Sequence, residues 1–208
     1  EKELLELGDT CTPRMHSSLF PPVFLSQSRE ACACLCGWTA LGDEPALELV
    51  VSQLEEERQF ERATALSVFH LNMRRALQTL DLAAREMPDS NFPIVAVAIA
   101  GYPGHAAISD AASSTAAPTA QSTASLWKHT IARQTGADAN PYIRFLYAFL
   151  CGEADDVMEM LESSETIQLS DRIGFACRFI NNSALDKLVS NITYKHVTSG
   201  DISGILLT

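Results

Sequence analysis

Cysteine sulfurs are the first groups in this sequence whose spacing could support chemistry. Cys32, Cys34 and Cys36 alternate with Ala33 and Leu35, and the other cysteines are distant, at positions 11, 151 and 177. A structural zinc site uses Cys-x-x-Cys pairs with a second pair further along the chain, and this spacing does not supply them. An even number of cysteines also permits disulfides, but a chain of this size and apolar content does not need them. We therefore expect reduced, packed thiols and no metal site.

The histidines and carboxylates give no catalytic pattern. No His-x-x-x-His or His-Glu pair occurs. His70 is expected at a helix end, where the helix dipole favours a cation. Cys151 and Cys177 fall on apolar helix faces and are predicted to be core residues rather than nucleophiles. Asp155 and Asp156 are adjacent, so on a helix they point in different directions and make a poor general acid–base pair. No catalytic, cofactor-binding or metal-binding residue is predicted, and partner-binding residues are not assigned.

Composition narrows the class of protein. Apolar residues make up 47% of the 208 residues and charged residues 20%, which is ordinary for a folded protein. The net charge of −11 argues against a nucleic-acid-binding surface and against adsorption to anionic lipid. No apolar run of 18 residues indicates a transmembrane helix, and the N-terminus lacks a signal-peptide layout. Because the first residue is Glu, we expect an excised piece of a longer chain.

The helices that would position any functional residues are most clearly indicated between positions 58 and 87. The second half of this stretch has apolar residues at 73, 76, 77, 80, 84 and 87, which form one stripe on a helix. Asn72 is expected to cap that helix. The first half carries apolar residues at every third position from Phe60 to Phe69. Two amphipathic helices with a break near Leu71 form a hairpin, which needs neighbouring hairpins to bury its stripes.

Further helices are predicted on both sides of this hairpin. A helix from Ser28 to Leu41, capped by Ser28, should turn Ala31, Cys34, Leu35 and Trp38 inward. The run Ile94–Ala100 is apolar on all sides and is predicted to be a buried central helix. The remaining helices are expected at 1–10, 45–56, 122–135, 141–151 and 154–161, from Ser170 and Asp171 onward, after a cap at Ser183, and from 201.

Four features of the sequence are predicted to lie on the surface or in loops. Arg74 and Arg75 lie off the apolar stripe and are expected to be solvated, as is the run of glutamates at 55–57. Residues 11–28 are rich in Pro and Ser and are predicted to be a loop or extended crossing segment that lies on the helices or on a partner. Residues 105–123 are low-complexity Ala, Ser and Thr and are predicted to be an exposed, partly disordered insertion.

These elements predict an all-α protein: an α-solenoid of stacked antiparallel helical hairpins, with roughly nine to eleven helices, spanning residues 1–208 as a single domain. A tetratricopeptide array is not favoured, because its recurrent residues at a period of 34 are missing.

Several phrases resemble the α-solenoid of the Mio (missing oocyte, or Mios) family. They lie in order along residues 36–208: Cys36–Trp38, Phe60–Ala63, Asn72–Ala76, Asn140–Tyr142 with Phe145 and Ala148–Leu150, Asp171–Phe179, and Gly204–Thr208. Residues 1–30 resemble the family only in their general character. Each phrase alone is weak, but the ordered set is fairly specific.

The resemblance implies a WD-repeat protein with an N-terminal β-propeller, this solenoid and a C-terminal zinc-binding region. Such proteins are subunits of the GATOR/SEA nutrient-sensing complex, which acts upstream of the target-of-rapamycin (TOR) kinase at the lysosomal or vacuolar surface. It implies partners among the other subunits, including a nucleoporin/coat-type β-propeller subunit, with neither nucleic acid nor direct membrane insertion. The family's zinc ligands do not map onto Cys32, Cys34 or Cys36. The segment is therefore expected to be a non-catalytic, cytoplasmic scaffold that is recruited to the lysosomal or vacuolar membrane.

Two other classes of function remain open. A coat-like or nuclear-pore-type helical scaffold would have a similar fold. A helical enzyme or small-ligand binder would need a deep pocket that gathers His70, the cysteines and Trp38.

Overall fold

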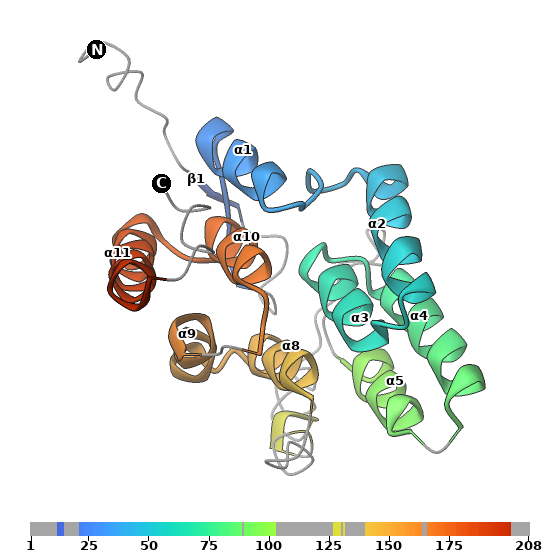
Figure 1. The fold of residues 1–208 in the computed structure, drawn as a ribbon. Coiled ribbons are helices and arrows are strands. Elements are labelled where there is room, and N and C mark those ends of the chain that lie inside the picture. Colours follow the sequence, from blue (N-terminus) through green and yellow to red (C-terminus); the bar gives the residue numbers. More distant parts are fainter. Residues whose placement is uncertain are drawn as a thin grey trace, which may run out of the picture. The chain divides into compact units, whose positions relative to one another are not determined.

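The structure is a computed structural model that describes residues 12–14, 21–88, 90–102, 127–129, 131, 140–163 and 166–200. Helices dominate this part of the chain, so the predicted all-α class is confirmed (Figure 1). The elements are β1 (Thr12–Arg14), β2 (Val23–Leu25), α1 (Gln27–Leu35), α2 (Glu44–Glu56), α3 (Phe60–Phe69), α4 (Met73–Glu86), α5 (Phe92–Ala100), α8 (Pro141–Cys151), α9 (Ala154–Ser163), α10 (Leu169–Phe179) and α11 (Asn182–Ser199). The predictions for residues 1–10, 105–123 and 201–208 fall outside the described residues, as does most of the predicted helix at 122–135.

The chain divides into two compact units. Unit 1 holds β1, β2, α1, the end of α9, α10 and α11. Unit 2 holds α2 to α5, the described residues 127–129 and 131, α8 and the start of α9.

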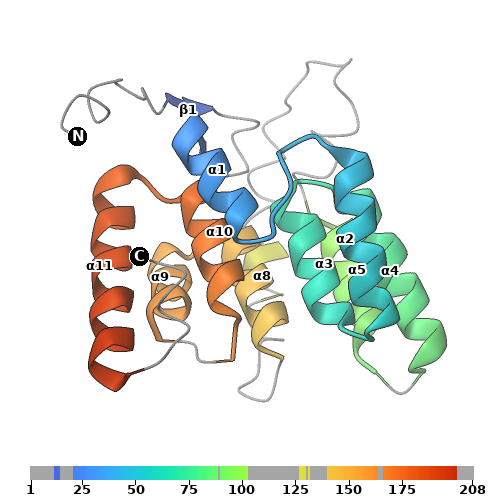
Figure 2. The same ribbon diagram turned by 45° about the horizontal axis from the view of Figure 1, so that its top comes forward.

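Unit 2 is organised around α3. This helix packs against α2, α4 and α8, and α4 packs in turn against α5 (Figure 2). Every side chain of α3 from Ala63 to Phe69 is buried. The ring of Phe69 lies edge-on to those of Phe145 and Phe149, with centroids 5.0 and 5.4 Å apart. The predicted hairpin of α3 and α4 is therefore confirmed, with buried neighbours on several sides.

The Asn72 cap of α4 is also confirmed. Its side-chain oxygen accepts a hydrogen bond from the Arg75 amide at 3.0 Å, which satisfies one of the free N–H groups of the first turn. Asp43 caps α2 and Asn140 caps α8 in the same way, through the amides of Ala46 and Tyr142.

Four helices end in one shared turn. In each, a residue of positive φ follows the last helical turn, and the next amide donates to the carbonyl five residues earlier, as in a Schellman motif. The positive-φ residues are Gly37, Arg58, Leu71 and Gly152. The amide-to-carbonyl bonds are 2.8 to 3.0 Å long and run from Trp38 to Ala33, Gln59 to Leu54, Asn72 to Ser67 and Glu153 to Ala148.

The prediction that Arg75 is solvated is wrong, and so is the prediction of a solvated Glu55. The Arg75 side chain is 8% exposed and that of Glu55 is 13% exposed, and the two groups form a bidentate pair at 2.7 and 2.8 Å. Thr79 joins this pair by donating to Glu55 at 2.7 Å. Glu48, whose side chain is 57% exposed, accepts from Arg75 Nε at 2.6 Å. A charge-assisted network therefore ties α4 to α2.

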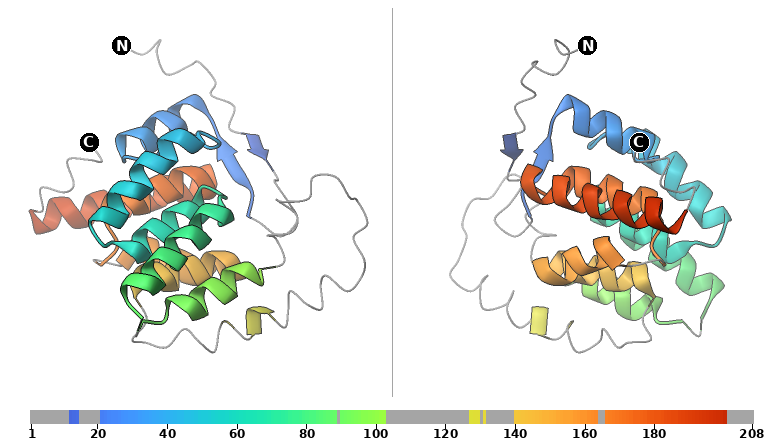
Figure 3. Two further views of the ribbon diagram at one scale, coloured as in Figure 1. Left: turned by 90° about the vertical axis from the view of Figure 1, so that its right-hand side faces the viewer. Right: turned by 60° about the vertical axis from the view of Figure 1, so that its left-hand side comes forward.

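Unit 1 begins with a short antiparallel pair of strands, in which Thr12 pairs with Leu25 and Arg14 with Val23 (Figure 3). The expectation of an extended segment lying on the helices is confirmed for β2, which packs on α10 and α1 with Val23 fully buried. Its pairing with β1 was not predicted, because Pro13 argues against a strand; an edge strand tolerates a proline.

The prediction for α1 is wrong in its cap and in its buried face. Ser26, and not Ser28, accepts the capping bond from the Arg29 amide. Ala31 and Cys34 are exposed, and Leu35 is 81% exposed. The residues that α1 and the turn after it bury are Arg29, Ala33, Cys36 and Trp38.

Gly174 allows Trp38 to reach the backbone of α10. A Cβ atom at position 174 would lie 2.6 Å from Nε1 of Trp38 and 2.7 Å from two ring carbons. The indole N–H donates to the buried Asp171 carboxylate at 3.4 Å. The absence of a side chain at Gly174 therefore leaves the space that the indole occupies.

Three other predictions need correction. The helix over Ile94–Ala100 forms but is not buried all round, since Ile94 is 49% and Val97 74% exposed. α10 begins one residue before Ser170, with Gln168 as its cap, and Asp171 is buried. Asn181 caps α11 in place of Ser183.

Replacing Glu55 by Gln should destabilise the protein by about 3 kcal/mol, because it removes the main anionic partner of a buried guanidinium. The matched control is Glu48→Gln, which removes an exposed partner and should cost less than about 1 kcal/mol. Urea unfolding of both variants measures the difference. Equal costs would show that Glu55 is not the principal partner of Arg75.

The effect of Glu55→Gln should also depend on pH. Burial alone would raise the pKa of Glu55, but hydrogen bonds from Arg75 and Thr79 and the charge of Arg75 lower it below 4.5. The stabilisation is then complete above pH 4.5 and is lost as the pH falls through the lower folded-state pKa. The stability gap between wild type and variant should narrow below pH 4.5. A gap that widens on acidification would contradict the assigned direction.

Gly174→Ala should destabilise unit 1 by about 1–3 kcal/mol, because the added methyl group displaces the indole of Trp38. A double-mutant cycle with Trp38→Ala tests this cause, since alanine has no ring for the new Cβ to strike. The double variant should lose less stability than the sum of the single variants. Additive losses would mean that the two positions do not collide.

Candidate functional site

The described histidines are separated and have structural roles or surface positions. His70 is buried at the end of α3, where its Nδ1 lies 2.8 Å from the Leu66 carbonyl oxygen, so the predicted capping role is confirmed. His129 is exposed and His196 half-buried near the end of α11. Among the described residues, no group of three or more His, Cys, Asp or Glu side chains could hold a metal ion. No helix in this part of the chain is long and apolar enough to span a membrane.

Three cysteines of unit 1 influence one another's pKa. Cys32 lies in the last turn of α1 and Cys36 follows that turn, while Cys177 comes from α10. Hydrogen bonding, first with Cys177 and then with Cys36, lowers the pKa of Cys32, and burial acts in the opposite direction. Hydrogen bonding to Cys32 raises the pKa values of Cys36 and Cys177.

Two buried arginines flank the thiols. Arg29 is 7% exposed and its Nη1 donates to the carbonyls of Cys177 and Ile180 at 2.6 and 2.8 Å, so that it caps the end of α10. Its Nη2 donates to the side-chain oxygen of Asn182 at 2.5 Å. Arg29 also stacks on the ring of Phe24 at 5.3 Å.

The second arginine, Arg178, is 4% exposed. Its Nη2 donates to the Thr39 carbonyl at 2.8 Å, and its guanidinium carbon lies 5.1 Å from the centre of the Trp38 ring. Nη1 of Arg178 is buried without a hydrogen-bond partner. Burial lowers the pKa of Arg178 to about 10, which reflects the cost of keeping this cation out of water.

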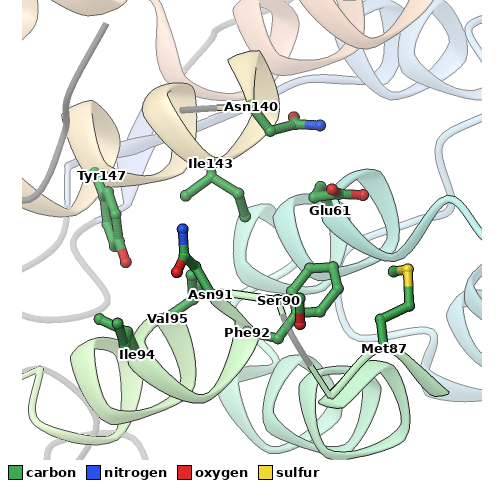
Figure 4. Close-up of a pocket in the computed structure, with 10 residues that line it drawn as sticks. All are labelled: Glu61, Met87, Ser90, Asn91, Phe92, Ile94, Val95, Asn140, Ile143 and Tyr147. Carbon is green, nitrogen blue, oxygen red and sulfur yellow. The ribbon is translucent and has the colours of Figure 1, made fainter. Parts of the chain in front are cut away.

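An open groove of about 480 Å³ runs between α5 and α8 in unit 2 (Figure 4). Its lining is mixed: Glu61, Met87, Ser90, Asn91, Phe92, Ile94, Val95, Asn140, Ile143 and Tyr147. Neither a cysteine nor a histidine is among these residues. A ligand binder would need a pocket that gathers His70, the cysteines and Trp38. This groove is lined by none of these residues.

Exposed apolar side chains are spread over several helices. The most exposed are Leu35 (81%), Leu49 (75%), Val97 (74%), Tyr194 (71%) and Val197 (70%). Scattered apolar residues are normal on protein surfaces and do not by themselves define a contact site.

The sequence placed the cysteines and histidines on helices, but it did not show which side chains lie near one another. Cys177 was correctly placed in a core, but nothing in its spacing links it to Cys32. Arg29 and Arg178 were missed altogether. The available signal was their position on otherwise apolar helix faces, where a cation is buried only with specific partners.

The chain was compared with known proteins. It is 31% identical over 188 residues to a Danio rerio protein named GATOR2 complex protein MIOS, which covers 90% of this chain. It is 30% identical over 186 residues to the Drosophila melanogaster GATOR2 complex protein Mio, which covers 89% of it. SEH-associated protein 4 of Saccharomyces cerevisiae is 24% identical over 180 residues and covers 86%.

The chain spans only part of these relatives: 19% of the length of each animal protein and 15% of the yeast protein. A family model described as MIOS, alpha-solenoid, matches residues 8–179 and so runs through both units. Both the predicted α-solenoid and the resemblance drawn from the quoted phrases are thereby confirmed. Since the match covers most of its length, this chain belongs to the MIOS family and represents its α-solenoid segment.

Proposed function

We propose that this chain is a non-catalytic scaffold segment of a GATOR/SEA-type complex, and that it works by protein–protein assembly. The observation that carries the proposal is membership in a family whose relatives are named as GATOR2 complex proteins. The architecture is consistent with it. The described polar clusters are used internally: Arg75 joins α4 to α2, and Arg29 joins α1 to the end of α10. Cohesion within each unit, rather than a reaction centre, is what these contacts provide.

The proposal extends to the setting of the complex. Its partners are the other GATOR/SEA subunits, among them a nucleoporin/coat-type β-propeller subunit. The name SEH-associated protein 4 of the yeast relative supports association with a further protein. Through this assembly the parent protein regulates TOR signalling in response to amino acids, at the lysosomal or vacuolar surface. Both units are proposed to belong to one solenoid, since the family match passes through each of them.

Assembly should fail when the fold of this segment is broken. Phe69→Ala removes the ring at the centre of the Phe69–Phe145–Phe149 contacts and should cost about 3–5 kcal/mol. We expect affinity purification of the full chain carrying Phe69→Ala, or lacking residues 21–200, to recover much less of the sister subunits. Loss of TOR-substrate phosphorylation control on amino-acid addition should accompany it.

The matched control is His129→Ala, which changes an exposed side chain and should leave recovery unchanged. Sister subunits recovered at wild-type yield from the deletion variant would overturn the scaffold proposal. Normal assembly with altered TOR control would show that the segment acts after assembly.

A further inference from the structure

The groove between α5 and α8 has the size and the lining of a binding site. Its volume of about 480 Å³ lies within the range of about 300–1,000 Å³ that is typical of ligand sites. Part of its lining is apolar and well packed: Phe92, Val95 and Ile143 are each 5–6% exposed. The ring of Phe92 lies edge-on to that of Phe60 at 6.1 Å, which fixes the start of α5 on α3. The apolar wall of the groove is therefore in place before any partner binds.

Two polar side chains on the groove are not used by the fold. Among the described lining residues Glu61 is the only charged one, and its carboxylate makes neither a hydrogen bond nor an ion pair within that part of the chain. The side chain of Asn91 makes no capping bond to α5. It points across the groove toward Ile143 (Figure 4). A carboxylate and an amide are thus available beside an apolar wall.

This charge selects the chemistry of the occupant. The described lining offers a carboxylate and neither lysine nor arginine, so a basic segment is attracted and an acidic or phosphorylated one is repelled. The net charge of −11 acts in the same direction over a longer range. Sites for small molecules usually bury most of the ligand, whereas an open groove leaves one side in solvent. A segment of a protein chain suits such a groove better.

We propose that this groove binds a segment of a partner protein in which an apolar side chain lies beside a lysine or arginine. The apolar side chain packs against Phe92, Val95 and Ile143, and the cation pairs with the Glu61 carboxylate. Asn91 hydrogen-bonds to the backbone of the segment. This inference deepens the proposed scaffold function, on which it rests for taking the occupant to be a protein.

A phage-displayed library of random heptapeptides, selected on the full chain, tests the chemistry of the occupant. The selected peptides should carry Lys or Arg beside an apolar residue. Fluorescence anisotropy of a labelled selected peptide should show at least about tenfold weaker binding to Glu61→Lys. Replacing the basic residue of that peptide by Glu should restore its binding to this variant. A library that gives no such basic and apolar peptides would overturn the proposal.

The matched control is Glu56→Lys, which makes the same change of net charge at an exposed position of α2 that does not line the groove. It should alter the affinity of the selected peptide by less than about twofold, because exposed charges outside the contact are screened. Equal losses in Glu61→Lys and Glu56→Lys would show that the peptide responds to overall charge, and would overturn the pairing with Glu61.

The apolar part of the contact is tested at the rim. Ile94 lines the groove and is 49% exposed, so Ile94→Ser changes the groove with little effect on the core. It should weaken binding of the selected peptide by about threefold or more, because apolar contact area is lost. Val97→Ser, at a 74% exposed position one turn further along α5 and outside the groove lining, should leave binding unchanged. Equal effects of the two substitutions would contradict the assignment.

The groove and the scaffold proposal can fail separately. In the full chain, Glu61→Lys should keep the wild-type helical circular dichroism and reduce the recovery of at least one sister subunit by at least about half. Recovery of every subunit at wild-type yield, with binding of the selected peptide lost, would overturn the groove as an assembly contact. The scaffold proposal would then still stand, because it is judged by the variant that lacks residues 21–200.

Discussion

The burial of α3 is the constraint on which unit 2 depends. A helix whose consecutive side chains from Ala63 to Phe69 are all buried cannot have a solvent face. It must be surrounded, and α2, α4 and α8 surround it. Small residues at 63, 65 and 67 let these neighbours approach, and Phe69 fills the space toward α8. Of these neighbours, α2 and α4 each leave a polar face in solvent, whereas α8, like α3, buries consecutive side chains, from Phe145 to Cys151.

The two units solve the same electrostatic problem differently. In unit 2 the guanidinium of Arg75 meets carboxylates, so its charge is neutralised where it lies. In unit 1 the guanidinium of Arg29 meets carbonyls at the end of α10, and that of Arg178 meets the Thr39 carbonyl and the Trp38 ring. Unit 2 therefore pairs its buried cation directly with carboxylates, whereas the two cations of unit 1 are held by uncharged acceptors. Burial raises the pKa of the Cys151 thiol in unit 2, and it also raises those of Cys36 and Cys177 in unit 1.

Local patterns were enough to locate the helices, because the periodicity and the caps of a helix depend on residues that are close together in the sequence. The hairpin of α3 and α4, its Asn72 cap and the capping role of His70 were all predictable. The partners of Arg75 were not, since Glu48 and Glu55 lie 27 and 20 positions away and no local rule pairs them. For the same reason no local pattern predicts that Cys32 and Cys177 influence each other's pKa. The buried side of α5 could not be predicted, because a uniformly apolar helix has no polar face that marks its solvent-exposed side.

The shared turn at the ends of α1, α2, α3 and α8 has a consequence for divergence. It is held by backbone amides and carbonyls, so it places few demands on the side chains around it. Even the left-handed position tolerates Arg58 and Leu71, at an expense of about 1–2 kcal/mol each relative to glycine. Most residues of such a chain can therefore be substituted during evolution while the backbone still reverses direction at the same positions. What repeats along this chain is a backbone conformation and not a sequence motif. Relatives that share only a quarter to a third of their residues can therefore still have the same fold.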